Sequence, residues 1–394
     1  MKRIFTILSL ILLPVCSFGQ TDYEIAKNFM EKKGVSIENK STTRTDKPYS
    51  IFNGENGDGF AIVKDGIVVG YSTNGKIDDI PAQLKNILET KTRYADVYPD
   101  EFVPRNLSPI EPLIRTKWGQ HYPYNDKCPT INGERCMTGC AATAIAQLLY
   151  YYRLPYGCKE FDGKYSEPYY NETISYLPQT TFDWDNMLEV YENGNYTQEQ
   201  VDAVAELMLY CGALSHCNYG LYETYGYINP GINVNGEDIF SYYLSFDKSR
   251  WYENDEYSES EMISILDKEL EAKRPVIVLG VTSNFASHFY LIDGRDSEGF
   301  YHINWGFSGG GDGYFIVSME LAQKYGAING IAEWSYYLSF LAVHGSLEYT
   351  SIDGVRKNLE NGNVYNLQGM VVGDTLDGLP RGVYIQNGKK YIVK

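Results

Sequence analysis

The chain has 394 residues, with 34 basic and 51 acidic side chains and a formal net charge of −17 at neutral pH. This charge argues against nucleic-acid partners and anionic membrane surfaces, because no basic face offsets the repulsion from phosphate groups. Hydrophobic residues make up 43% and charged residues 22%, which is typical of a globular protein, and the length predicts two or three domains.

The first twenty residues have the pattern of an export signal. A short basic start precedes the apolar run Ile4–Val15, which is too short to cross a bilayer as a helix of about 20 residues. Small residues at Ser17 and Gly19 predict cleavage before Gln20, and a lipoprotein signal through Cys16 is the alternative. Since no other stretch could span a membrane, we expect a secreted, periplasmic or cell-surface protein.

Residues 22–90 are predicted to form a small unit of their own. Tyr23–Lys33 has helical spacing, Gly59–Tyr71 reads as two short strands around an Asp-Gly turn, and Ile80–Glu89 reads as a second helix. Lys91–Arg115 carries four prolines and little periodicity, which is typical of an exposed linker where proteolytic cleavage concentrates.

The large unit that follows has its helices first and its strands second. Helices are predicted at Gly139–Arg153, Gln198–Gly212 and Glu261–Ala272, and strand-like runs separated by glycines begin at Pro275. This order predicts an α+β fold rather than alternating βαβ units. The tail has short strands and an Asn387-Gly388 turn, so it is predicted to be a separate β appendage.

Cys140 is the first candidate for a chemical role. Gly139 permits a close approach at the start of a run of helix formers, so Cys140 is predicted to lie at a helix N-terminus. The partial positive charge of a helix N-terminus favours the nucleophilic thiolate. The alternative is a buried, inert cysteine, which is the commoner fate of a single thiol.

A thiolate nucleophile needs a base, and the histidines are the candidates: His121, His216, His288, His302 and His344. His288 opens a predicted strand and lies 148 residues beyond Cys140 (288 − 140), which matches the papain-type spacing of roughly 130–150 residues. His302 would alternate along a strand with Asn304, which is typical of a half-buried structural residue.

The base in turn needs an orienting partner. A turn after Asp293 would bring Asn304 beside His288, where its side chain could accept a hydrogen bond from the imidazole, with Trp305 covering the pair. Asp293 is the rival orienting residue. The alternative for this segment is an ordinary glycine-rich hairpin with a core tryptophan.

Gln120 lies 20 residues before Cys140 and could donate to a developing oxyanion together with the Cys140 N–H. Gln120, Cys140, His288 and Asn304 then occur in the order of a papain-type site, which is harder to obtain by chance than any one of them.

Four segments carry a resemblance to a known family: WGQHYPYNDKCP, TGCAATAIAQLLYYY, SHFYLIDGRD and YHINWGFSGGGDGYF. They resemble the streptopain family of papain-like cysteine peptidases, over about residues 20–346. The resemblance implies an exported zymogen whose N-terminal propeptide blocks the cleft until proteolysis removes it. It also implies two subdomains, one helical with the nucleophile and one β with the base, and a cleft between them that takes protein or peptide substrates.

By this resemblance Cys140 is the nucleophile, His288 the base, Gln120 an oxyanion donor, and Asn304 and Trp305 the Asn-Trp element near the base.

The resemblance has one departure. Phe307 stands where a second tryptophan is usual, and since it keeps an aromatic ring we expect altered packing rather than lost activity. The glycine-rich Ser308–Gly313 loop, with Gly309 and Gly310, is expected to edge the substrate cleft. Phosphate binding is a poor alternative for this loop, because no helix or lysine follows it.

Five other cysteines follow the predicted signal, and the sequence leaves their pairing open: Cys128, Cys136, Cys158, Cys211 and Cys217. Without a CxxC pair or an HExxH motif, we expect neither a metal nor a cofactor.

The predicted organisation is a signal peptide (1–19), an inhibitory propeptide with linker (20–110), a papain-like catalytic domain (111–346) and a C-terminal β appendage (347–394). The appendage resembles the C-terminal strands of some exported Bacteroidetes proteins, so a type IX sorting signal and a plain appendage both remain open. The alternative functions are another thiol acyl-transfer enzyme, such as a transglutaminase or amidase, and an inactive surface-binding protein.

Overall fold

The computed structural model describes much of the chain from residue 21 onward. The described residues are 21–41, 49–64, 66–75, 77, 107–153, 157–161, 174, 176–228, 238–244, 246, 248–253, 256–281, 287–317, 337–344 and short stretches between 364 and 393. The predicted signal peptide, the predicted helix Ile80–Glu89 and the Asn387-Gly388 turn lie outside them.

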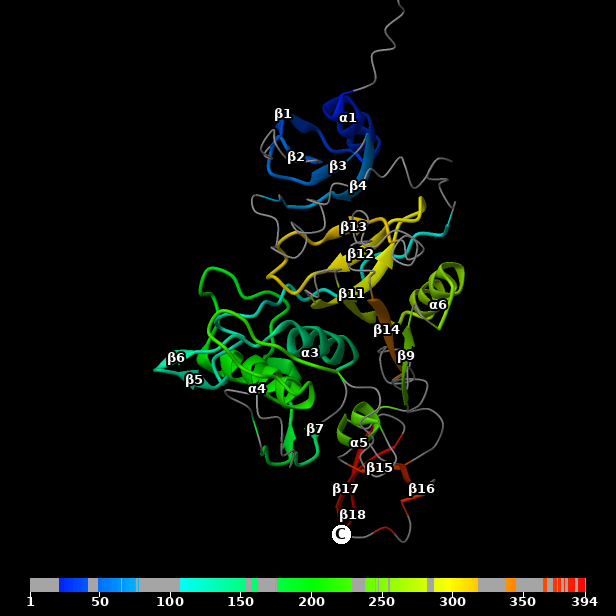
Figure 1. The fold of residues 1–394 in the computed structure, drawn as a ribbon. Coiled ribbons are helices and arrows are strands. Elements are labelled where there is room, and N and C mark those ends of the chain that lie inside the picture. The colour runs from blue at the N-terminus through cyan, green and yellow to red at the C-terminus, as the bar shows by residue number, and fades with distance from the viewer. Residues whose placement is uncertain are drawn as a thin grey trace, which may run out of the picture.

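A long antiparallel sheet runs through the middle of the molecule (Figure 1). In the described part of the chain it has ten strands, in the order β1-β2-β3-β4-β13-β12-β11-β10-β14-β9. Their bounds are β1 Ile37–Ser41, β2 Tyr49–Gly54, β3 Phe60–Lys64, β4 Ile67–Ser72, β9 Lys248–Glu253, β10 Val276–Val281, β11 Ser287–Arg295, β12 Tyr301–Asn304, β13 Gly313–Phe315 and β14 Tyr337–His344.

Strand β11 is buried along nearly its whole length because its two faces meet two different cores. Phe289 and Leu291 belong to the core of the helical subdomain. Tyr290 and Ile292, which alternate with them, belong to the core on the other side of the sheet. The centre of the sheet therefore separates two hydrophobic layers, and this explains why the sequence here is continuously apolar rather than alternating.

The helical subdomain packs against one side of β11 (Figure 1). Its main helices are α3 Cys140–Tyr152 and α4 Gln198–Leu214, which contact each other. The smaller elements are α5 Ile239–Leu244, the 3-10 helix Trp184–Asn186, and two hairpins, β5 Thr130–Ile131 with β6 Glu134–Arg135 and β7 Gly157–Cys158 with β8 Thr180–Thr181. Helix α6, Glu259–Glu271, contributes Met262, Leu266 and Leu270 to the opposite core.

The N-terminal unit consists of α1, Asp22–Lys32, and strands β1–β4. A capping box begins α1: the Thr21 hydroxyl accepts from the Glu24 N–H, and the Glu24 carboxylate accepts from the Thr21 N–H. This unit is not separate from the rest, because β4 pairs with β13 through Tyr71–Tyr314 and Gly70–Phe315. Its apolar residues share one core with residues of β10, β11, β12 and β13.

Most of the described predicted elements are confirmed. The helices predicted at Tyr23–Lys33, Gly139–Arg153 and Gln198–Gly212 appear within two residues of their predicted ends. The linker prediction is wrong from Leu107 onward. Residues 107–116 run beside β11, with hydrogen bonds from the Leu107 N–H to Ser297 and in both directions between Ile110 and Arg295. The segment is held by backbone hydrogen bonds, so its sequence does not need the alternating apolar pattern by which a strand is recognised.

The described part of the tail forms its own four-stranded sheet in the order β16-β15-β17-β18 (Figure 1). The strands are β15 Val364–Asn366, β16 Val371–Gly373, β17 Gly382–Gln386 and β18 Lys389–Val393. This agrees with the short strands predicted for a C-terminal appendage.

Candidate active site

Cys140 is the first residue of α3, as predicted. Gly139 precedes it with φ +86°, a left-handed conformation that side chains rarely adopt. A Cβ at this position would also come within 2.9 Å of the Thr224 side chain. The glycine therefore allows the segment around Thr224 to pack against the start of α3, the helix that carries the thiol.

The Cys140 thiol lies against backbone N–H groups at the junction of α3 and β11. Burial raises its pKa, and the N–H groups of Phe289, Ala141 and Cys140 itself act in the opposite direction. The helix N-terminus thus acts to lower the pKa of the thiol, as predicted, but burial has the larger effect in the full-length chain. Because Phe289 directly follows His288, the structure brings the predicted nucleophile and base to the same junction.

His288 is buried in β11, and its ring nitrogen Nε2 lies 2.9 Å from the Trp305 carbonyl oxygen. A carbonyl can only accept, so Nε2 must donate and carry the proton. In the neutral ring the lone pair is then on Nδ1, which is the arrangement that a general base requires. Burial lowers the pKa of His288 to about 4, so the imidazole is neutral at neutral pH.

Aromatic rings surround this imidazole. The Phe307 ring lies parallel to it, with centroids 4.9 Å apart and an interplanar angle of 4°. Trp305 is fully buried and lies 6.3 Å away at 23°. Phe307 therefore keeps a stacking contact on the base where a tryptophan was expected, and these rings limit access of water to the histidine.

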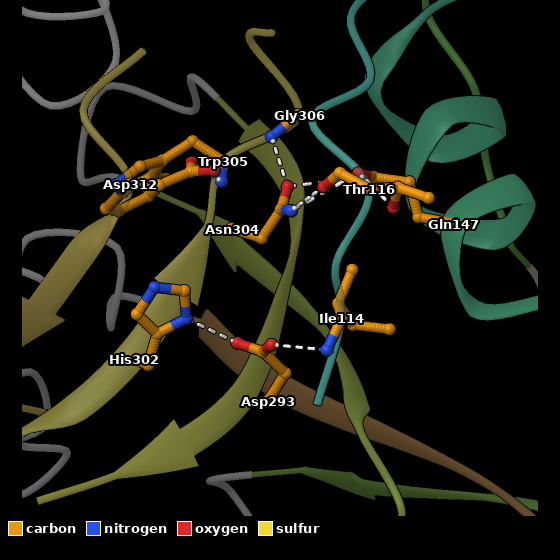
Figure 2. A network of polar contacts seen from close by, with 9 residues as sticks. All are labelled: Ile114, Thr116, Gln147, Asp293, His302, Asn304, Trp305, Gly306 and Asp312. Atoms are coloured by element: carbon orange, nitrogen blue, oxygen red, sulfur yellow. Dashed lines mark hydrogen bonds and ion pairs between the residues drawn. The ribbon is translucent and has the colours of Figure 1, made fainter. Parts of the chain in front are cut away.

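Asn304 is close to His288 in the chain, but its hydrogen bonds go elsewhere (Figure 2). Its Nδ2 donates to the Thr116 carbonyl at 2.8 Å and to Gln147 Oε1 at 3.2 Å. Its Oδ1 accepts from Gln147 Nε2 and from the Gly306 N–H, each at 3.0 Å. The orienting bond to the imidazole comes from the backbone of Trp305, which a residue-type pattern does not reveal.

Asp293, the rival orienting residue, binds His302 instead (Figure 2). Its carboxylate lies 2.6 Å from His302 Nδ1 and accepts from the Ile114 N–H at 2.8 Å. Burial acts to lower the pKa of His302, but the carboxylates of Asp293, Asp312 and Glu111 together outweigh it and the pKa is raised. This pair joins residues 107–116 to the sheet, as a structural role for His302 predicts.

Gln120 is buried. Its backbone carbonyl accepts a hydrogen bond at 3.1 Å from the N–H of Thr138, which lies two residues before Cys140. The glycine-rich loop lies beside the same segment, since the Ser308 N–H donates to the Trp118 carbonyl at 3.0 Å. Gly309, with φ +81°, leaves room for the Lys117 side chain. Gln120 thus borders the residues just before α3, and the loop borders Lys117 and Trp118 in the same segment as Gln120.

Two polar residues near the site were not singled out from the sequence: Gln147 and Asp312. Asp312 Oδ1 accepts from the Trp305 N–H at 2.8 Å (Figure 2), and burial raises the pKa of this carboxyl to about 6. Gln147 is the one long amide in the apolar run from Ala141 to Tyr152. A single glutamine in an otherwise apolar helix could have indicated a buried polar network, because a polar side chain inside a buried helix needs hydrogen-bond partners.

Four of the other cysteines are buried thiols whose pKa is raised by burial: Cys128, Cys158, Cys211 and Cys217. Among the described residues, no three His, Cys, Asp or Glu side chains are grouped as metal ligands would be. None of the described helices combines the length and the apolar character needed to cross a membrane.

Comparisons with known proteins identify relatives of this chain. The sequence model of the Peptidase C10 family matches residues 118–315, which is half of the chain. The chain is 28% identical to streptopain of Streptococcus pyogenes over 318 residues, covering 69% of this chain and 73% of that protein. It is 25% identical over 372 residues to the thiol protease/hemagglutinin PrtT of Porphyromonas gingivalis, covering 81% of this chain and 41% of that protein.

A structure of a prointerpain A fragment from Prevotella intermedia has a similar fold, with a TM-score of 0.61 at 23% identity. It covers 79% of this chain and all of the fragment. The mixed α+β fold is thus that of the papain-like C10 peptidases. The chain belongs to the Peptidase C10 family and is a cysteine peptidase.

Proposed function

We propose that the chain is the exported precursor of a cysteine endopeptidase, with Cys140 as nucleophile and His288 as base. The observation that carries this is the junction of α3 and β11, where the Cys140 thiol lies beside the N–H that follows His288 and the Trp305 carbonyl holds Nε2–H. In this tautomer the lone pair is on Nδ1, the nitrogen that we propose takes the thiol proton.

The reaction follows from these roles. His288 Nδ1 takes the thiol proton, and the Cys140 sulfur attacks the peptide carbonyl carbon. The resulting oxyanion is stabilised by the Cys140 N–H and the Gln120 amide. The imidazolium then protonates the leaving amine, which leaves an acyl-enzyme. Water, deprotonated by His288, hydrolyses the thioester and restores the thiol.

Purified protein tests this function directly. A thiol-reactive peptide probe should label Cys140 and block cleavage of a protein substrate, and the products should be free acids. Incorporation of an added amine with little hydrolysis would instead show an acyl transferase. A chain that neither labels nor cleaves would contradict the proposal.

Residues 20–110 are proposed to be the inhibitory segment. The support is the contact of its described part with the catalytic half of the sheet. Lys33 binds Asp296 at 3.0 Å and Glu298 at 3.1 Å in the turn between β11 and β12. The Tyr71 hydroxyl donates to the same Asp296 at 2.7 Å. These bonds, together with β4–β13 pairing, hold the N-terminal unit one strand away from β12 and the Trp305 segment.

Replacing Lys33 by alanine is expected to speed maturation of the full-length chain by about fivefold, because a partly buried pair of contacts is lost from the interface. The measurement is the time course of precursor loss on gels. Lys27→Ala is the matched control, since Lys27 lies on the same helix with an exposed Glu31 partner and should mature at the normal rate. Equal rates for the two variants would contradict the proposed interface.

The mature enzyme is expected to begin upstream of Leu107, a few residues before the boundary that the sequence predicted after residue 110. The Leu107, Ile110 and Leu113 N–H groups bond to β11 or the turn after it, and Ile114 is buried. Cleavage within this stretch would remove hydrogen-bond partners from the end of β11, the strand that carries His288, and should destabilise the product. N-terminal sequencing of the matured protein checks this. A stable, active enzyme that begins after Arg115 would show that these contacts are dispensable.

A further inference from the structure

A chain of hydrogen bonds runs from the nucleophile helix to His288, and Figure 2 shows its first part, from Gln147 through Asn304 to the Gly306 N–H. It starts at Gln147, two turns after Cys140 on α3. The Gln147 and Asn304 side-chain amides pair head to tail, with Nε2 to Oδ1 at 3.0 Å and Nδ2 to Oε1 at 3.2 Å. The two side chains are 1% and 3% exposed, so the pair is formed away from water and is not weakened by it.

The next link is the peptide unit between Trp305 and Gly306. The Gly306 N–H donates to Asn304 Oδ1 at 3.0 Å. This N–H shares one planar trans peptide with the Trp305 carbonyl, so the two point in opposite directions. Anchoring the N–H on Asn304 therefore aims the carbonyl at His288 Nε2, which lies 2.9 Å away. Asn304 thus acts on the base through the backbone.

The orientation of both amides is determined by neighbours whose roles cannot be reversed. Asn304 Nδ2 faces the Thr116 carbonyl, which can only accept. Gln147 Oε1 faces the Trp118 N–H at 3.3 Å, which can only donate, and the Thr116 hydroxyl at 2.8 Å. Neither amide can flip without losing these bonds, so Gln147 must present its N–H to Asn304 Oδ1.

We propose that Gln147 is a positioning residue for the catalytic base: it holds Asn304 so that the Trp305–Gly306 peptide directs its carbonyl at His288. The inference rests on the proposed role of His288. It makes the geometry of the base depend on the helix that carries the nucleophile, so the two subdomains must be docked for Nδ1 to face the thiol.

Gln147→Glu separates this role from simple packing. A carboxylate still accepts from Thr116, Trp118 and Asn304 Nδ2, but it cannot donate to Asn304 Oδ1. We expect kcat to fall by about 10- to 100-fold with KM within about twofold, because a small misplacement of a catalytic group slows the chemical step rather than binding. The added negative charge should also move both limbs of the pH–rate profile to higher pH.

All variants are matured with a trace of affinity-tagged wild-type enzyme that is removed before assay, so that neither slow self-processing nor residual wild-type activity hides the result. Gln198→Glu, an exposed glutamine on α4, is the matched control and should keep wild-type kcat. Gln147→Met tests the same loss without a buried charge and should also lower kcat with little change in KM. Thermal unfolding of each variant is measured first.

A folded Gln147→Glu protein with wild-type kcat and pH profile would overturn the proposal, and so would failure of both Gln147 variants to fold, which would make the residue purely structural. Cys140→Ala is measured in parallel. If it still cleaves substrate, the proposed function fails. If it is inactive while Gln147→Glu is normal, only the positioning role fails.

Discussion

Replacement of Cys140 by alanine is expected to abolish peptide hydrolysis and to leave the N-terminal unit attached to the catalytic domain. Without the sulfur no acyl-enzyme can form, and loss of a nucleophile of this kind lowers kcat by about 10⁴-fold or more. If maturation is autocatalytic, the purified variant should remain a single long band during incubation. Gel analysis and N-terminal sequencing of wild type and variant measure both effects together.

Two controls make this result specific. Cys158→Ala removes a buried thiol in β7, which follows the C-terminal end of α3 whereas Cys140 begins that helix, and this variant should mature and cleave normally. A trace of wild-type enzyme should trim the Cys140→Ala precursor, which would show that the variant is folded and cleavable. Normal removal of the N-terminal unit from purified Cys140→Ala, without added wild-type enzyme, would contradict the assignment of Cys140 as the nucleophile.

Replacement of His288 by glutamine is expected to lower kcat by about 10³-fold, because the thiol would lose its base. The pKa values of His288 and Cys140 predict a second measurable property, the pH dependence of thiol alkylation. Burial lowers the pKa of His288 to about 4 and raises that of Cys140, so in the precursor the imidazole is neutral and the thiol protonated at neutral pH. Alkylation of the precursor by iodoacetamide should therefore be slow at pH 6 and rise with pH, since only the thiolate reacts.

In His288→Gln, alkylation of Cys140 at high pH should persist, which would show that the thiol is intact and that only proton transfer is lost. His121→Gln is the control, since His121 is exposed and should not affect kcat. Fast alkylation of the wild-type precursor down to about pH 4 would instead show a thiolate–imidazolium pair already formed, and would contradict the two pKa directions.

The local elements could be predicted because they depend on neighbours in the chain. The helix at Cys140 follows from a glycine and a run of helix formers, and β10 and β11 follow from continuous apolar runs. The candidate nucleophile and base were identified from residue types and spacing, since few side chains can supply a thiolate and a base.

Other features could not be predicted because they rest on backbone groups and on distant partners. Residues 107–116 looked like a linker, yet they are anchored by N–H and carbonyl groups that every residue carries. Asn304 was expected to bind His288, yet its amide is occupied by Gln147 and Thr116, while the Trp305 carbonyl takes the orienting position.

The sequence by itself determined the family, the main described helices and the central strands, and it named Cys140 and His288 as the candidate pair, because these depend on side-chain chemistry and local periodicity. Only the tertiary structure decided that the N-terminal unit extends the catalytic sheet through β4 and β13. It also decided the protonation of the pair, because burial depends on everything packed around a group and outweighs the helix N-terminus at Cys140.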